Sequence, residues 1–345
     1  MVDYTKSLTV GFAHTRTHLS LNAHSNLQPF IPSIFTRFHS LTHLHLHSGK
    51  ITSPSINDDG LRLITSRCPN LTRLNLRACP GITSHGMAIL SQNCKKLKIF
   101  SCSFCRFGAK GVIELLKRCY SLEELSFENL KIDFNVWGRF LEMVAVSDNS
   151  LVEVHLEDVD VSDTSLLALS KCSRLQVLHI HNGVLKRIGN EALIAIAKYS
   201  LNLQELVLIG VDACCISLEA IAVNCRKLER LHLCSSNKIT DVEISCIAGK
   251  CVALNKLSIR NCWVSDKGVE AFVLGSPNLV EISLEKCENV THEVEDRLRA
   301  IKGSLVVKLD AVKSETANAI VGDFGVQEHV IEVPPPAGHQ PCGCY

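Results

Sequence analysis

The sequence predicts an α/β solenoid in which short parallel strands form one layer and helices form the other. The first observation is an L-x-x-L-x-L pattern that opens ten times between Leu41 and Leu279, at intervals of about 26 residues. The second is a helix signal after several of these openings, and the third is a set of cysteines at two fixed positions of the repeat. This period is typical of leucine-rich repeats, which predicts a horseshoe with the strands on its concave face and the helices on its convex face.

The openings define the predicted strands. Successive side chains of a strand point to opposite faces, so the apolar residues of the pattern point inward and the residues between them face the concave side. The ten matching segments are 41–46, 71–76, 97–102, 122–127, 151–156, 175–180, 203–208, 228–233, 254–259 and 279–284.

The helix signal is clearest after the eighth opening. Thr240 and Glu243 have the spacing of a capping box, and Ile244 and Ile247 continue at helical spacing. Each unit is thus a strand, a turn and a helix that cannot bury its apolar edge alone, which predicts one stacked domain. Similar helix starts occur at 82–84, 161–163 and 264–266.

The ends of the chain depart from the repeat. We expect residues 1–17 to be unstructured or a partial N-terminal cap, and residues 18–311 to form about ten to eleven repeats. Residues 312–345 lose the period and include three consecutive prolines at 334–336, so we expect a disordered tail.

The sequence holds seventeen cysteines, of which ten occupy two positions of the repeat. One cysteine per repeat suits a small buried side chain whose thiol binds loop backbone, whereas a metal site needs several ligands that converge on one point. We therefore expect these thiols to be buried and reduced, and we predict no metal and no cofactor. Two alternating sets, His43-His45-His47 and His179-His181, are the alternative metal ligands, but no fourth ligand is identifiable for either. The two groups of cysteines are Cys68, Cys94, Cys119, Cys172, Cys225 and Cys251 before the opening leucine, and Cys79, Cys105, Cys262 and Cys287 after the strand.

Composition narrows the classes of partner. There are 36 Lys and Arg residues against 35 Asp and Glu, so no global field attracts nucleic acid or an anionic membrane. Aromatic residues make up 5% of the chain, too few for a base-stacking surface. No signal peptide or uninterrupted apolar span is evident, and we expect a soluble protein of the cytoplasm, the nucleus or both.

The predicted concave face carries charges of alternating sign, which favours a specific protein partner over a polyanion. We find no catalytic motif and predict a binding protein, not an enzyme. The residues expected to contact the partner are basic Arg73 and Arg77, acidic Glu124, Glu128, Glu153 and Glu157, and basic Arg230, Lys256 and Arg260.

Several segments resemble the plant VIER subfamily of F-box proteins with cysteine-containing leucine-rich repeats. They are Leu19-Ser-Leu-Asn-Ala23, Pro29-Phe-Ile-Pro32, Ile34-Phe35-x-Arg37-Phe38, Phe107-Gly-Ala-Lys-Gly111, Lys186-Arg-Ile-Gly189 and above all Leu201-Asn-Leu-Gln-Glu-Leu-Val-Leu-Ile-Gly-Val-Asp-Ala213. The resemblance covers roughly residues 18–310. It implies a substrate receptor of an SCF ubiquitin ligase, which recruits a protein for ubiquitination and proteasomal degradation.

In that family an F-box precedes the segment that matches residues 19–38 and binds the Skp1 adaptor. We do not expect residues 1–17 to replace it, so the resemblance implies Skp1 and cullin as partners only if an F-box is supplied. One alternative is a scaffold, or a competitor of the intact receptor, with no ligase role. Another is small-molecule sensing, for which Arg230, Lys256 and Arg260 supply charge but the aromatic lining is lacking.

Overall fold

The structure is a computed structural model that describes residues 16–23, 26–48, 55–130, 150–159, 163–170, 172–181, 188–310 and 330–333. The chain divides into two compact units. The first comprises Met1–Ser121 with Gly325–Tyr345, and the second comprises Leu122–Phe324. Each is described separately.

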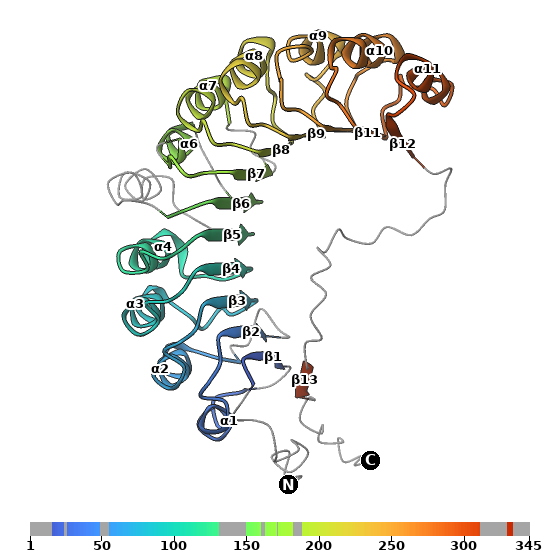
Figure 1. Cartoon of the computed structure of the whole chain (residues 1–345). Helices are drawn as coiled ribbons and strands as arrows, with labels where there is room; N and C mark the ends of the chain where they lie inside the picture. The colour runs from blue at the N-terminus through green and yellow to red at the C-terminus, as the bar shows by residue number, and fades with distance from the viewer. Residues whose placement is uncertain are drawn as a thin grey trace, which may run out of the picture. The chain divides into compact units, whose positions relative to one another are not determined.

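In the first unit, five parallel strands lie in the order β13-β1-β2-β3-β4. The helices lie along one side of these strands (Figure 1). Strand β13 belongs to the segment predicted to be a disordered tail; the rest of that segment lies outside the described residues. The strands are β1 (His18–Ala23), β2 (His43–Ser48), β3 (Arg73–Arg77), β4 (Ile99–Ser103) and β13 (Val330–Val333), and the helices are α1 (Ile31–Arg37), α2 (Asp58–Arg67), α3 (Ser84–Asn93) and α4 (Gly108–Leu116).

In the second unit, eight parallel strands follow one another in chain order, β5 to β12, again with helices along one side (Figure 1). The strands are β5 (Glu124–Glu128), β6 (Glu153–Glu157), β7 (Val177–His181), β8 (Glu205–Ile209), β9 (Arg230–Cys234), β10 (Lys256–Arg260), β11 (Glu281–Glu285) and β12 (Val306–Leu309). The helices are α6 (Asp163–Leu169), α7 (Asn190–Tyr199), α8 (Cys215–Asn224), α9 (Asp241–Ser245), α10 (Asp266–Gly275) and α11 (Val294–Ile301).

The strands pair in register, so that equivalent positions of neighbouring repeats lie side by side. Leu206 pairs with Leu231, and Leu231 with Leu257. All apolar residues of the ten predicted openings are 0% to 3% exposed, which confirms both the period and the strand register. The predicted leucine-rich-repeat fold is therefore confirmed within each unit.

The predicted capping box is confirmed at the start of α9. The Thr240 hydroxyl accepts a hydrogen bond from the backbone N–H of Val242, and the Glu243 carboxylate accepts one from the backbone N–H of Thr240 at 3.1 Å. Two of the four N–H groups left open at the helix start are thereby satisfied.

Candidate protein-interaction face

Among the described residues, helices cover one face of the sheet in each unit and leave the other without helices; we call this second face the open face. Its side chains are the third, fifth and seventh residues of each pattern, because strand residues alternate. All nine sequence-predicted contact residues lie on it. Arg73 and Arg77 are on β3 in the first unit, and Glu124, Glu128, Glu153, Glu157, Arg230, Lys256 and Arg260 are on β5, β6, β9 and β10 in the second.

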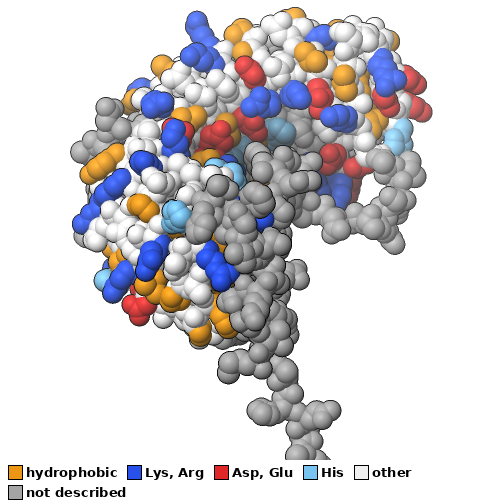
Figure 2. All heavy atoms as spheres, turned by 60° about the horizontal axis from the view of Figure 1, so that its bottom comes forward, with side chains coloured by type: hydrophobic (Ala, Val, Ile, Leu, Met, Phe, Trp, Pro, Cys, Tyr) orange, Lys and Arg blue, Asp and Glu red, His pale blue; other side chains and the backbone are white. Residues whose placement is uncertain are grey.

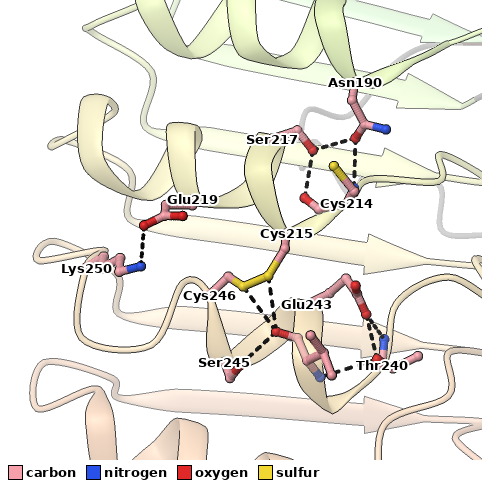
Figure 3. The surroundings of a disulfide bond; sticks show 11 residues. Asn190, Cys214, Cys215, Ser217, Glu219, Thr240, Glu243, Ser245, Cys246 and Lys250 are labelled. Atoms are coloured by element: carbon pink, nitrogen blue, oxygen red, sulfur yellow. Dashed lines mark hydrogen bonds and ion pairs between the residues drawn. A yellow bond between two sulfur atoms is a disulfide. The ribbon is translucent and has the colours of Figure 1, made fainter.

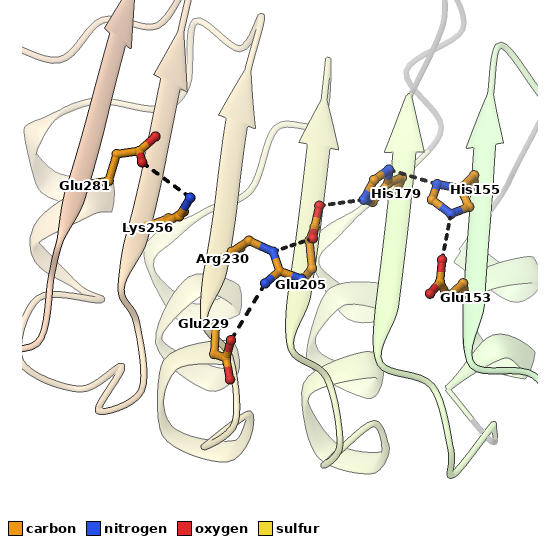
Figure 4. Close-up of polar contacts among 8 residues, drawn as sticks. All are labelled: Glu153, His155, His179, Glu205, Glu229, Arg230, Lys256 and Glu281. Carbon is orange, nitrogen blue, oxygen red and sulfur yellow. Dashed lines mark hydrogen bonds and ion pairs between the residues drawn. The ribbon is translucent and has the colours of Figure 1, made fainter. Parts of the chain in front are cut away.

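A chain of polar contacts crosses the open face of the second unit from β6 to β9 (Figure 4). His155 Nε2 is 3.6 Å from the Glu153 carboxylate, and the Nδ1 atoms of His155 and His179 are 2.9 Å apart. His179 Nε2 lies 2.9 Å from one oxygen of Glu205, and Arg230 Nε donates to the other at 2.6 Å. These five side chains hold one another in place.

The contact between the two Nδ1 atoms requires one of them to donate and the other to accept, so the tautomers of His155 and His179 are linked.

The carboxylates respond to these partners. The hydrogen bond from His179, with a further contribution from Arg230, lowers the pKa of Glu205 to about 2, although partial burial acts in the opposite direction. The neighbouring imidazole of His155 likewise lowers the pKa of Glu153. Burial lowers the pKa of His232 on the neighbouring strand. The face is therefore electrostatically organised, with both carboxylates held in the charged form at neutral pH.

A hollow of about 520 Å³ lies beside this chain of contacts, over β8 to β12. One end is apolar, at Val207 and Ile209, and the other is charged. Lys256 and Arg260, two of the predicted contact residues, line this hollow, and Glu281 and Glu285 follow from the same strand alternation. Two lysines that share the hollow with them, Lys286 and Lys308, were not predicted.

Lys308 was missed because the opening position of the L-x-x-L-x-L pattern, two residues before β12, holds Ser304 and not leucine. The signal that could have found it is the alternation Val307-Lys308-Leu309 about one repeat after β11. Lys308 donates to Glu281 at 2.7 Å, and this hydrogen bond is the main reason that the pKa of Glu281 is lowered.

Among the described residues, one group has the spacing of metal ligands. Oxygen atoms of Glu124 and Glu153 and a ring nitrogen of His155 lie within 4.8 Å of one another. Two carboxylates and an imidazole could hold a divalent cation. Both Glu153 and His155, however, already belong to the chain of contacts described above.

The histidines proposed as alternative ligands have other roles. His43 stacks on His18 with 3.9 Å between the ring centroids, and its Nδ1 lies 2.8 Å from the Thr42 hydroxyl. His179 is part of the contact chain, and His181 Nδ1 lies 3.5 Å from an oxygen of Asp158. Neither alternating set forms a three-ligand group within the described part of the chain.

The ten cysteines at the two repeat positions, which we call the repeat-phase cysteines, are unpaired, as expected. Eight of the ten are buried, and Cys251 and Cys287 are half-buried. Their thiols reach carbonyl groups of the preceding repeat, as from Cys68 to Phe38 at 3.2 Å. Burial raises the pKa of Cys172 and Cys225 to about 12, so these thiols are kept protonated.

Two cysteines outside the repeat positions form a disulfide that the repeat pattern does not predict. Cys215, the first residue of α8, is bonded to Cys246 at the end of α9 (Figure 3). Their separation of 31 residues is one repeat plus about one helical turn, which lets the start of one helix meet the end of the next. The expectation of reduced thiols concerned the ten cysteines at the repeat positions, and this pair lies outside them.

The comparisons with known proteins agree with the repeat. A family model described as "Leucine Rich repeat" matches residues 250–273. The chain is 28% identical over 160 residues to antagonist of mitotic exit network protein 1 of Saccharomyces cerevisiae, covering 44% of this chain and 27% of the relative. It is 25% identical over 139 residues to coronatine-insensitive protein homolog 1b of Oryza sativa, covering 39% and 22%. It is 20% identical over 268 residues to F-box/LRR-repeat protein 21 of Bos taurus, covering 77% and 55%.

The chain therefore spans between about a quarter and about half of the length of these relatives. In the described residues, no helix is long and apolar enough to cross a membrane. Among solved structures, a chain of the yeast Rad7–Elc1 complex matches with a TM-score of 0.63 and 18% identity, covering 91% of this chain and 80% of that one. The likeness shows a shared fold: this chain has a leucine-rich-repeat architecture and sequence similarity to F-box/LRR proteins.

Proposed function

We propose that this chain is a protein-recognition module that binds a protein partner through its open face. The observation that carries the proposal is the ordered polar surface from β6 to β11, where side chains of both signs are held by partners on neighbouring strands. Such a surface favours a complementary protein and disfavours partners with misplaced charges. Charged side chains of both signs also lie close together in the view of Figure 2.

More specifically, we propose that the module serves as the substrate receptor of an SCF-type ubiquitin ligase. The similarity to F-box/LRR-repeat protein 21 and the resemblance to the plant VIER subfamily support this role. The chain would recruit the substrate in the cytoplasm or nucleus and leave ubiquitin transfer to the ligase. Skp1 and cullin would join through an F-box, and the alternative is a scaffold or competitor without a ligase role.

The first experiment asks whether the open face binds. Affinity capture followed by mass spectrometry would compare the wild type with a triple variant, Arg230→Glu, Lys256→Glu and Arg260→Glu. A matched control reverses three exposed cations on the helix side, Lys198, Arg226 and Lys267. We expect the open-face variant to lose partners that the control retains. Loss in the control alone would contradict the proposal.

The second experiment separates a receptor from a scaffold. An F-box would be fused before Thr17, and the fusion would be reconstituted with Skp1, cullin and a partner from the first experiment. We expect ubiquitination of that partner, and no ubiquitination with the open-face triple variant. Partner binding without ubiquitination would favour the scaffold.

A further inference from the structure

A row of five open-face residues runs across the strands of the hollow. Val207 on β8 pairs with His232, His232 with Ser258, Ser258 with Ser283, and Ser283 with Lys308 on β12. The row thus begins with an apolar side chain, passes over two small serines and ends in a cation. We call it the central row.

Two ion pairs flank the serines of the central row. On one side Lys256 Nζ lies 3.3 Å from the Glu281 carboxylate, and on the other Arg260 Nε lies 3.7 Å from that of Glu285. Because the flanking side chains are long and the serines are short, the central row forms the floor of a trough. Figure 4 shows Lys256 and Glu281 reaching toward each other from adjacent strands.

The charge of the trough is uneven. Its lining contains the cations Lys256, Arg260, Lys286 and Lys308 but only two carboxylates, Glu281 and Glu285, which leaves two positive charges in excess. The excess lies over β10 to β12, whereas the β8 end is apolar, with Val207 and Ile209. A complementary ligand has an apolar group at one end and negative charge at the other.

The length of the trough selects an extended peptide. Four strand spacings of about 4.8 Å separate β8 from β12, a span of about 19 Å, and an extended chain advances about 3.3 Å per residue. About six residues therefore cover the row. The Ser258 hydroxyl, which has no hydrogen-bond partner among the described residues, and that of Ser283 lie where they can bind a peptide backbone.

Resting on the proposed function, we infer that the trough binds an extended segment of the partner protein. An aliphatic residue of the segment lies over Val207 and Ile209, and one or two Asp or Glu residues, about five positions away, lie over Lys308 and beside the Arg260 side chain, which extends from β10 toward Glu285 on β11. Carboxylates fit better than a phosphate group. Three of the cations, Lys256, Arg260 and Lys308, are already paired with Glu281 or Glu285, and a dianion concentrated beside these two carboxylates would be repelled more strongly than separate single charges.

The test uses fluorescein-labelled heptapeptides and fluorescence anisotropy with the full chain. The lead probe is Leu-Ala-Ser-Ala-Ser-Asp-Asp, together with its reversed sequence, because the direction of binding is not fixed by the row. Matched probes replace leucine with serine, both aspartates with asparagine, or both aspartates with phosphoserine. A further probe shortens the spacer by three residues.

We expect one direction of the lead probe to bind at least about ten-fold more tightly than its asparagine and serine versions. Lys308→Glu and Arg260→Glu should each weaken binding about five-fold or more, and Glu285→Gln should strengthen it about two- to five-fold by freeing Arg260. Lys267→Glu, an exposed cation on the helix side of the second unit, is the matched control and should leave binding unchanged. Circular dichroism would confirm that each variant is folded.

Equal binding of the lead and asparagine probes, or binding that Lys308→Glu does not weaken, would overturn the inference. Tighter binding of the phosphoserine probe would assign the trough to a phosphorylated partner and would also overturn it. If the open-face variant loses its partners in the capture experiment while no peptide binds, the proposed function stands and the inference falls. If a peptide binds with the expected selectivity but partner capture is unaffected by the open-face variant, the trough is a peptide-binding site, and the proposed function, in which the captured partners bind through the open face, falls.

Discussion

The carboxylate of Asp241 accepts two hydrogen bonds from Ser265 of the following repeat, from the backbone N–H at 2.7 Å and from the hydroxyl at 2.6 Å. The first residue of α9 thus holds the N-cap residue of α10. The same pair of bonds joins Thr83 to Asp58, at 2.8 and 2.5 Å, so neighbouring repeats are connected at their helix starts. Negative charge at these positions also complements the positive end of each helix.

This connection leaves no room for a side chain at Gly268. A Cβ atom built there overlaps the Asp241 carboxylate. We therefore expect Gly268→Ala to destabilise the protein by about 1–3 kcal/mol, although alanine is normally the better helix former. Urea denaturation would measure the change in the free energy of unfolding.

Two controls test the cause of this effect. Gly303→Ala, where a Cβ would have no neighbour closer than 4.0 Å, should change stability by no more than about 0.5 kcal/mol. In an Asp241→Gly background the cost of Gly268→Ala should largely disappear, because both the carboxylate and the Asp241 Cβ, which would lie 2.7 Å from the added atom, are gone. Additive effects of the two substitutions would show that the overlap is not the reason.

The strand register predicts that substitutions at an inward-pointing residue of β9 and at an open-face residue of β10 differ in their effect on stability. Leu231 is 0% exposed, and Leu231→Ala should cost about 2–5 kcal/mol. Arg260→Glu reverses a solvent-facing charge and should cost within about 1 kcal/mol. Arg230→Glu should cost more than Arg260→Glu, because Glu205, its partner at 2.6 Å, is more buried than Glu285. If urea denaturation showed a larger loss of stability for Arg260→Glu than for Leu231→Ala, the assigned strand register would be wrong by one residue.

The lowered pKa of Glu205 predicts a pH dependence of stability. Its pKa is about 2 in the folded chain and 4.5 without the fold, so its contribution is present above about pH 4.5 and is lost as the pH falls toward 2. We expect Glu205→Gln to lower stability at pH 6 by about 1–2 kcal/mol, a value discounted for partial exposure, and by less at pH 3.

Unfolding in urea at both pH values would measure this difference. Glu288→Gln removes an exposed carboxylate that has no ion pair among the described residues, and it serves as the matched control. A deficit for Glu205→Gln that is as large at pH 3 as at pH 6 would refute the role of the His179 and Arg230 contacts.

Much of the fold follows from the sequence because one physical rule repeats. Apolar residues such as Leu231 and Leu284 recur at a period of about 26 residues and must point inward. That period fixes the strand positions, the register and the open face together. Cysteines such as Cys262 share this phase, so their burial was predictable as well. The nine charged contact residues followed from the same alternation.

Contacts between side chains of different repeats were not predicted from the sequence. The bond from Ser265 to Asp241 joins residues at different positions of two repeats, and the apolar pattern carries no information about it. Lys308 escaped because β12 lacks an opening leucine. The Cys215–Cys246 pair escaped because both residues lie off the repeat positions, so only the packing of α8 against α9 brings them together.

This disulfide gives the last prediction. It closes a loop of about 31 residues, and cross-links of this size typically stabilise a fold by about 2–4 kcal/mol through the loss of freedom in the unfolded chain. We expect Cys215→Ser and Cys246→Ser to lower stability by similar amounts in urea denaturation under non-reducing conditions. We also expect the two substitutions to be non-additive when combined, since either one removes the same bond.

Thiol chemistry provides the independent measurement. Alkylation of the native chain, followed by reduction and a second label, should place the second label on Cys215 and Cys246 and not on the repeat-phase thiols such as Cys225. Cys225 stays protonated because burial raises its pKa to about 12, and it should react only after unfolding. Cys225→Ser is the matched control, and its effect on stability should be the same with and without reductant. If Cys215 and Cys246 were both alkylated in the first step, the cross-link between α8 and α9 would be absent in solution.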